Sequence, residues 1–468
     1  MLLFAQRFLR AARAVLVTLA GLVGSCAVHA ETVAVTGTLP EDYLPGLRAV
    51  LETAMRQSPQ MLLRQLEVDR SEAQVIISDA ERLPRLGGDV RFNSTRTAAT
   101  HSQATRDNGL FYSIGANQAV FHWGAIKNRR AMARINLAIA EKNYGEAYRL
   151  LAVQLRQSYL QLIAMNAMVR LHRFTVDTQQ SDLAVARERL GLGSTSAAEI
   201  AGRELDLSEA ELVLERAQNE LDAELQRFSR LAGLRPGLTP DQLPVDIPLP
   251  AYDPALADEI LAGFLREGGA TTFAAQVAEL NRQRADHAYR IARVRLLPRF
   301  NTGLVHSRES TTNATATQVA QVAITRQALE LRGDWDIFDG FATRGAKRDA
   351  LAERRGAEKT LAVERDAAMD EMQRRRRTVN YNARAQDIAE RRLTGAAVMV
   401  KVAEEDMKVA GTGSESAVQT ARRNLLAAQY NAALARANFL GEWSAFVSLA
   451  AADPVVQTLS PRYVRLSR

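Results

Sequence analysis

The sequence contains one succession of short motifs twice. The pairs, in chain order, are LPR at 83–85 and 297–299, a turn at Phe121 and Phe338, GLGSTSA at 191–197 with GTGSESA at 411–417, and RAQ at 216–218 with RAN at 436–438. The offsets between partners are 214, 217, 220 and 220 residues. Such a near-constant spacing indicates that one unit has been duplicated, so the chain must fold into two similar halves.

Both halves have the same order of expected elements. An amphipathic helix, expected at 42–82 and again at 254–295, ends at the proline of LPR, which cannot continue a helix. Two strands follow, with a Thr/Ser/Asn-rich segment between them at 94–108 and 307–325, which we expect to form a loop. A long helical stretch completes each half.

The strands alternate between apolar and polar residues, which is typical of a sheet with one face in an apolar environment. In the first strand of each half the positions on the apolar side are Leu86, Gly88, Val90 and Phe92, which align with Phe300, Thr302, Leu304 and His306. In the second strand they are Tyr112, Ile114, Ala116 and Val120, which align with Leu329, Leu331, Gly333 and Ile337. The alternate positions of the last strand are Glu330, Arg332, Asp334 and Asp336. Four charges in succession on one face need water on that side of the sheet.

The helical stretches, at 124–190 and 341–410, contain no proline and at 1.5 Å per residue are each about 100 Å long. Apolar residues repeat at alternating steps of three and four, as in the seam of a coiled coil. In the first half this seam comprises Tyr144, Tyr148, Leu151, Leu155, Ser158, Leu162, Met165 and Val169, and it continues after the tip as Leu207, Ala210, Leu214, Ala217, Leu221, Glu224, Phe228 and Leu231. We therefore expect antiparallel helical hairpins that bend at 191–195 and 411–415.

The first thirty residues have the pattern of a signal peptide. Three arginines precede an apolar run at 14–23, and the segment ends in Val-His-Ala at 28–30. The alternative is a lipoprotein signal, because VGSC at 23–26 would leave Cys26 acylated. Cleavage after Ala30 instead would remove this cysteine, the only one in the chain, and exclude disulfides and thiol chemistry.

The charge balance gives no indication of a nucleic-acid partner. Removal of the signal takes three of the 60 basic residues and none of the 53 acidic ones, so the formal charge falls from +7 to +4. The basic cluster Arg374–Arg377 follows several acidic residues on the same expected helix, and we interpret it as a solvated face.

No enzyme, cofactor or metal site is expected. The histidines lack the spacing of metal ligands, and no catalytic triad or pair of carboxylates can be identified among the charged helix faces. After residue 30 no apolar run approaches the 18 residues of a membrane-spanning helix, so strands would have to make any membrane span.

Taken together in this order, the motifs resemble those of the TolC-like family of outer-membrane efflux and secretion channels. The residues that carry the resemblance are LPR before each first strand, VFHWG at 120–124 and IFDGF at 337–341 where strand gives way to helix, and the sequences at the two hairpin tips. The resemblance covers essentially the whole mature chain, and its strength is the doubled order of the motifs.

The resemblance implies an α+β membrane protein with an internal duplication. Three copies would form one transmembrane β-barrel, four strands from each subunit, which continues into a long periplasmic α-helical coiled-coil tunnel. The barrel-to-tunnel corners would be Phe121 with Gly124 and Phe338 with Gly340. Residues that would face the lipid are Tyr112, Ile114, Leu329, Leu331 and Ile337.

The sequence departs from the family pattern at two places. Where the family commonly has Phe-Asp-Gly-Gly at each corner, Trp123 and Phe341 each replace a glycine. Where the family commonly has an aspartate six residues after the tip glycine, Ala197 and Ala417 stand instead. Acidic residues that narrow the tunnel mouth in some members are therefore missing from the expected positions.

The implied function is that of a passive outer-membrane channel subunit in a tripartite export system of a Gram-negative bacterium. It would transport either a secreted protein, as in type I secretion, or small molecules, as in efflux. Its partners would be two further copies, outer-membrane lipid, a periplasmic adaptor protein and an inner-membrane ABC or proton-driven pump.

The hairpin tips would contact the adaptor through Leu190, Gly191 and Leu192 and through Ala410, Gly411 and Thr412. Each tip glycine could alternatively do no more than close a helix end in the left-handed conformation. A periplasmic coiled-coil scaffold or adaptor is the alternative function.

The expected organisation of the chain follows from the duplication. Residues 1–30 form the signal peptide, 31–233 the first repeat, 234–253 a proline-rich connector, 254–452 the second repeat and 453–468 an irregular, basic tail.

Overall fold

The computed structural model describes residues 39–98, 100, 104–314, 318–409, 414–460 and 463. All of them lie in one compact unit, Val35–Arg468. The predicted signal peptide and Cys26 lie outside the described residues, as do Ala410, Gly411 and Thr412 of the second tip.

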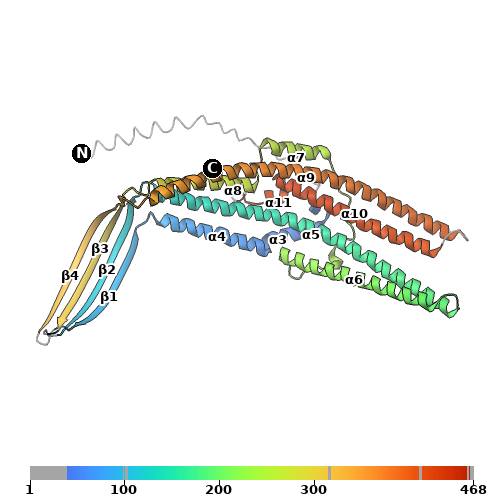
Figure 1. Ribbon diagram of the computed structural model, residues 1–468, viewed down its shortest axis with the longest axis horizontal. Helices are drawn as coiled ribbons and strands as arrows, with labels where there is room; N and C mark the ends of the chain where they lie inside the picture. The colour runs from blue at the N-terminus through green and yellow to red at the C-terminus, as the bar shows by residue number, and fades with distance from the viewer. Residues whose placement is uncertain are drawn as a thin grey trace, which may run out of the picture. The chain divides into compact units, whose positions relative to one another are not determined.

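Four strands form one antiparallel sheet in the order of the chain: β1 (Arg85–Thr97), β2 (Thr105–Phe121), β3 (Arg299–Ala314) and β4 (Val319–Asp334) (Figure 1). Each half of the sequence supplies one hairpin, and β2 pairs with β3 to join the halves, for example Ile114 with His306. The two-strand expectation for each half is confirmed. The outer strands β1 and β4 each have one neighbour in this sheet, so each keeps one edge unpaired.

The polar segments expected to be loops are mostly strand. The β1–β2 ladder continues to Thr97 opposite Thr105, and the β3–β4 ladder continues to Ala314 opposite Val319. The reason is that pairing satisfies the backbone donors and acceptors along each shared edge whatever the side chains, and threonine favours strands. The strands are therefore joined by residues 98–104 and 315–318 of the chain.

The predicted alternation of faces is confirmed by the strand register. Directly opposed residues share a face, and the ladders align Ala116 with Leu304 and Leu304 with Leu329. The face so defined, here called the apolar face, includes Leu86, Val90, Phe92, Leu110, Tyr112, Ile114, Leu304, Leu329 and Leu331. The opposite face carries Asp89, Arg91, Glu309, Arg326, Glu330, Arg332 and Asp334.

Two residues expected in the last strand lie beyond it. Asp336 and Ile337 follow the end of β4 at Asp334, in the segment that leads to the next helix. The strand ends early because the chain starts its turn into the helix here, before the apolar alternation ends.

Two helices of 67 residues dominate the remainder, α5 (Ala125–Gly191) and α9 (Ala342–Lys408), as the proline-free stretches predicted. Each folds back into an antiparallel partner, α6 (Ala197–Ala232) or α10 (Glu415–Leu449). Helix α10 also packs against α5, so the two hairpins share one core. Seam residues Leu151, Leu155, Leu162 and Phe228 are buried in this core, which confirms the coiled-coil pattern.

The helices before each sheet hairpin are interrupted where single helices were expected. The first copy is divided into α2 (Pro40–Tyr43), α3 (Pro45–Gln57) and α4 (Pro59–Ala80), and the second into α7 (Pro254–Arg266) and α8 (Phe273–Arg293). In the first copy each helix begins with a proline. Proline lacks a backbone N–H, which does no harm in the first turn of a helix, but for the same reason it cannot continue the preceding helix. In the second copy Gly268 and Gly269 have positive φ and end α7.

Three arginines, Arg156, Arg376 and Arg436, connect the other segments to the helical core through ion pairs. Arg156 of α5 is fully buried and its guanidinium donates to the carboxylates of Glu41 and Asp453, at 2.9 and 2.6 Å. Burial opposes the charge of Arg156, but hydrogen bonds and attraction from Asp453 and Glu41 outweigh it and raise the pKa. The tail after residue 452, expected to be irregular, instead begins with a short helix, α11 (Pro454–Gln457), capped by Asp453. It forms because the carboxylate of Asp453 satisfies both the arginine and a helix amide.

The second repeat contains the equivalent ion pair. Arg376 stands 220 residues after Arg156 and Asp258 stands 217 after Glu41, and Arg376 Nε donates to Asp258 at 2.9 Å. The connector, which includes the 3₁₀ turn η1 (Pro240–Gln242), is held by Arg436, which donates to Asp246 at 2.6 Å. The duplication is thus visible in the ion pairs as well as in the order of the elements.

Candidate functional site

The chain passes from sheet to helix at two corners, between β2 and α5 and between β4 and α9. Both corners have the same backbone conformation but different residues. Two successive residues have positive φ at each corner: Trp123 (53°) with Gly124 (77°), and Gly340 (62°) with Phe341 (69°). This region disfavours side chains, which gives a structural reason for glycine at Gly124 and Gly340. The other residue of each pair is the aromatic that replaces a glycine of the family pattern.

Aromatic side chains gather around both corners. Phe121 packs edge-on against Trp123, whose indole N–H donates to Pro298 O at 2.7 Å. In the second copy Phe338 packs edge-on against Phe341. Trp335, which the sequence interpretation missed, donates its indole N–H to Leu296 O at 3.0 Å.

These corner aromatics, Phe121, Trp123, Trp335, Phe338 and Phe341, are all exposed, by 41 to 72 %. Aromatic rings gathered at one level of a chain, with tryptophans among them, are typical of a boundary between lipid and water. The predicted corner residues Phe121, Gly124, Phe338 and Gly340 therefore lie together in the fold, with three further aromatics around them. Spacing alone could have identified Trp335, because it stands three residues before Phe338.

The first hairpin tip is described completely. Leu190 and Gly191 are the last residues of α5, and Leu192 is its C-cap and 77 % exposed. Gly193, with φ 71°, is the left-handed residue that closes the helix, so Gly191 does not have that role. Ser194 N donates to Arg189 O, and Ser196 caps the start of α6. The tip is thus a tight turn that presents an exposed leucine.

Beneath this tip the hairpin is held by its own small core of Leu183, Ala186 and Ile200. The carboxylate of Glu199 accepts from the hydroxyl of Thr195 at 2.7 Å and from Arg203 at 3.0 Å, and the pKa of Glu199 is lowered chiefly by the Thr195 hydrogen bond. Leu192 takes no part in these contacts. Its exposure therefore has no explanation within the hairpin itself.

The predicted lipid-facing residues lie on the apolar face, with one exception. Ile114, Leu329 and Leu331 are exposed by 62, 80 and 74 %, and Tyr112 of the same face is half-buried. Ile337 is exposed but lies outside the strand. Among the helices of the described residues, none combines the length and hydropathy needed to cross a bilayer.

Comparison with known proteins relates this geometry to a family. Residues 50–234 match the family described as outer membrane efflux protein. None of the curated proteins matches the sequence. The matched region runs from within α3, through β1, β2 and α5, to just beyond the end of α6.

Solved structures extend the likeness to both repeats. The outer membrane protein VceC of Vibrio cholerae is 15 % identical, with a TM-score of 0.62 over 88 % of this chain and 97 % of its own. The CmeC outer membrane channel of Campylobacter jejuni is 13 % identical, with a TM-score of 0.68 over 89 % of this chain and 88 % of its own. The resemblance to the TolC-like family is confirmed.

The same comparison covers the MtrE outer membrane channel of Neisseria gonorrhoeae, 14 % identical with a TM-score of 0.62 over 89 % of this chain and 90 % of its own. The predicted TolC-like fold, a four-stranded antiparallel sheet continued by long helices, is thus confirmed for the chain. The predicted outer-membrane location agrees with the family description and with these titles. The matched family is described as one of efflux proteins and not of enzymes, which agrees with the prediction that the chain is not an enzyme.

Proposed function

We propose that the protein is the channel subunit of a tripartite export system and acts as a passive conduit. In this proposal three copies join their sheets into one twelve-stranded barrel in the outer membrane, and the helical hairpins form a tunnel in the periplasm. The observation that carries the proposal is the sheet itself. It has an exposed apolar face, a charged opposite face and an unpaired edge at either side.

Such a sheet cannot remain open in a bilayer. Lipid offers no hydrogen bonds to the unpaired edges of β1 and β4, so a spanning sheet must close. Four strands are too few to close a barrel alone, whereas β1 of one copy can pair with β4 of the next. This argument disfavours the periplasmic scaffold, because a soluble coiled-coil protein would have no use for exposed Leu329 and Leu331.

The partners in this proposal are a periplasmic adaptor, docked on the hairpin tips, and an inner-membrane ABC or proton-driven pump that supplies the energy. Leu190, Gly191 and Leu192 would form the contact at the first tip, and Ala410, Gly411 and Thr412 at the second. The exposed position of Leu192 supports this role. The repeats 31–233 and 254–452, with the connector between them, are the units that we propose were duplicated.

Small-molecule efflux is the transport role favoured by the family description. Secretion of a protein by a type I system is the second candidate, because the predicted cleavage after Ala30 would leave a subunit without a lipid anchor. A strain that lacks the gene separates the two. If efflux is the role, the strain accumulates a fluorescent toxic amphiphile and the intact gene restores its export, while the set of secreted proteins does not change.

Loss of one secreted protein with normal efflux would indicate secretion instead. A deletion that changes neither the retained amphiphile nor the secreted proteins would contradict the export function.

A further inference from the structure

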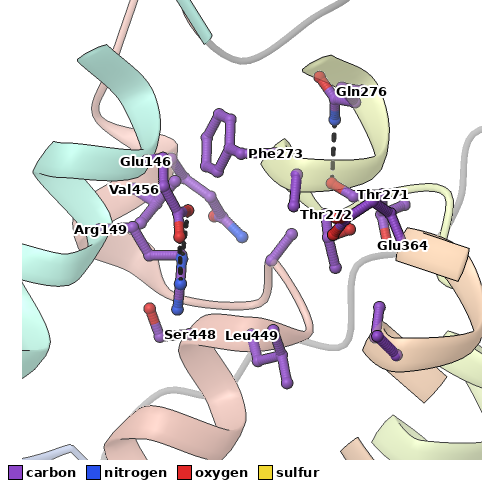
Figure 2. A pocket seen from close by; sticks show the side chains of 15 residues that line it. Glu146, Arg149, Thr271, Thr272, Phe273, Gln276, Glu364, Ser448, Leu449 and Val456 are labelled. Carbon is purple, nitrogen blue, oxygen red and sulfur yellow. Dashed lines mark hydrogen bonds and ion pairs between the residues drawn. The ribbon is translucent and has the colours of Figure 1, made fainter. Parts of the chain in front are cut away.

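A cavity of about 250 Å³ lies among the helices, away from the corners and the tips. Its walls come from α5, the start of α8, α9, the end of α10 and α11, so both repeats and the tail contribute. Figure 2 shows Glu146 and Arg149 on one side of this space and Gln276, Thr271 and Glu364 on the other. None of the functions discussed above uses it.

Three polar atoms in the cavity wall have no hydrogen-bond partner among the residues that the structure describes. They are Ser448 Oγ, Thr271 Oγ1 and Gln276 Oε1, each on a buried part of its side chain, and Ser448 as a whole is 0 % exposed. The amide nitrogen of Gln276 already donates to Thr271 O at 2.9 Å, so its oxygen is left as an acceptor. Leaving such groups unpaired in a buried site is unfavourable, so a bound molecule that pairs with them would be stabilised there.

The charge of the wall is negative. Arg149 is neutralised by Glu146 through two hydrogen bonds of 2.8 and 2.7 Å. Glu364 is half-buried, and within the described residues it has no hydrogen bond or ion pair. One unpaired carboxylate, one amide oxygen and two hydroxyl oxygens are all able to accept hydrogen bonds, and an ammonium group supplies three donors and a positive charge.

The rest of the wall is apolar. Phe273, Leu449 and Val456 line the space together with several alanines. The ring of Phe273 is buried against α5, because Gly145 has no side chain there and a Cβ at that position would lie 2.5 Å from the ring. A cavity of about 150 Å³ holds one benzene ring, so this one has room for a ring with a short substituent.

We propose that this cavity is a binding site for a small organic ammonium ion with an apolar body. The ammonium group donates to Glu364 and Gln276, and the body packs against Phe273 and Leu449. The site is independent of the conduit proposed above, because its ligand is bound between helices and need not be transported.

The test is calorimetric titration of the full chain, purified in detergent, with two probes of the same shape. Benzylammonium carries the charge and benzyl alcohol does not. We expect benzylammonium to bind saturably, with a Kd of about 1 mM or tighter, and benzyl alcohol to bind about tenfold more weakly. Equal binding of both probes, or no saturable binding of benzylammonium because water alone fills the space, would overturn the proposal.

Variants locate the site. Glu364→Gln should weaken benzylammonium binding about tenfold and leave benzyl alcohol unchanged, because it removes a charged acceptor and keeps the side chain's shape. Asp366→Asn is the matched control, since it removes the same charge from the same helix at an exposed residue that does not line the cavity. Ala367→Trp, at an exposed position of the rim, should block both probes. An equal loss in Asp366→Asn, or normal binding in Ala367→Trp with an unchanged melting temperature, would place the probe elsewhere.

Discussion

At the scale of single residues, the corners combine a strained backbone with an exposed aromatic side chain. Trp123 and Phe341 have positive φ although glycine would adopt this conformation at no cost. Backbone strain of this kind persists where the side chain has a use, and here the side chains belong to the corner aromatics. The sequence comparison identified both residues as replacements of glycine, but their left-handed conformation could be known only from the structure.

Phe341 allows a direct test of that strain. Phe341→Gly should be more stable than Phe341→Ala by about 1 kcal/mol, because both remove the exposed ring and only alanine keeps a Cβ in the left-handed region. Chemical denaturation of the two purified variants measures the difference. If the alanine variant were the more stable one, the residue would not have the conformation described here.

Lys142 of α5 is a second residue whose environment could not be inferred from the sequence. It is 1 % exposed, and its ammonium donates to Tyr463 O at 3.3 Å. Burial lowers the pKa of Lys142 from 10.5 to about 8, although the charge of Glu141 opposes the shift. A helical pattern shows that position 142 lies two residues before Tyr144 of the seam, but not that the chain's tail covers it.

The lowered pKa predicts a pH dependence of stability. The folded chain binds the Lys142 proton less tightly than the unfolded chain does. The resulting cost to folding, at most about 3 kcal/mol, is therefore fully present below about pH 8 and disappears as the pH rises to about 10.5. Lys142→Met should be more stable than the unaltered chain at neutral pH, and the difference in melting temperature should shrink as the pH is raised. A constant difference across this range would contradict the assignment.

At the scale of elements, the periodicities identified the long helices, the hairpins and both faces of the sheet. The strand lengths were underestimated, because Thr- and Ser-rich segments resemble loops in composition and only the ladder shows that they pair. The first helix was taken as continuous because its apolar pattern runs through Pro45 and Pro59. The ion pair of Arg156 with Glu41 and Asp453 joins residues 115 and 297 positions apart, which no local pattern can reveal.

The tip and the sheet should respond differently to one added charge. Leu192→Asp should leave the amount of assembled protein near normal and reduce export, because Leu192 is exposed on a bend at the opposite end of α5 from the sheet. An unpaired charge desolvated against a partner costs several kcal/mol. The measurements are assembled protein in outer-membrane fractions and export of a fluorescent amphiphile.

Leu331→Asp is the control, since it places the same charge on the apolar face of β4. It should lower the amount of assembled protein, at a depth-dependent cost smaller than the roughly 2 to 4 kcal/mol of a midplane lysine or arginine. If Leu192→Asp abolished assembly while Leu331→Asp had no effect, the roles of tip and sheet would be reversed.

At the scale of the whole molecule, the duplication explains why one chain presents two similar hairpins and two similar helical rods. The repeated order of motifs predicted this, and the equivalent pairs Arg156 with Glu41 and Arg376 with Asp258 support it. The sheet remains incomplete within one chain, because β1 and β4 have unpaired edges. An assembly that pairs these edges follows from the requirement that no backbone group stays unsatisfied in lipid.

The number of chains in the membrane-extracted protein tests this account most directly. Native mass spectrometry of the protein, extracted from outer membranes in a mild detergent, should give a complex of three chains. This complex should dissociate into single chains when a denaturing detergent replaces the mild one. A stable single chain recovered from the soluble periplasmic fraction would contradict the account.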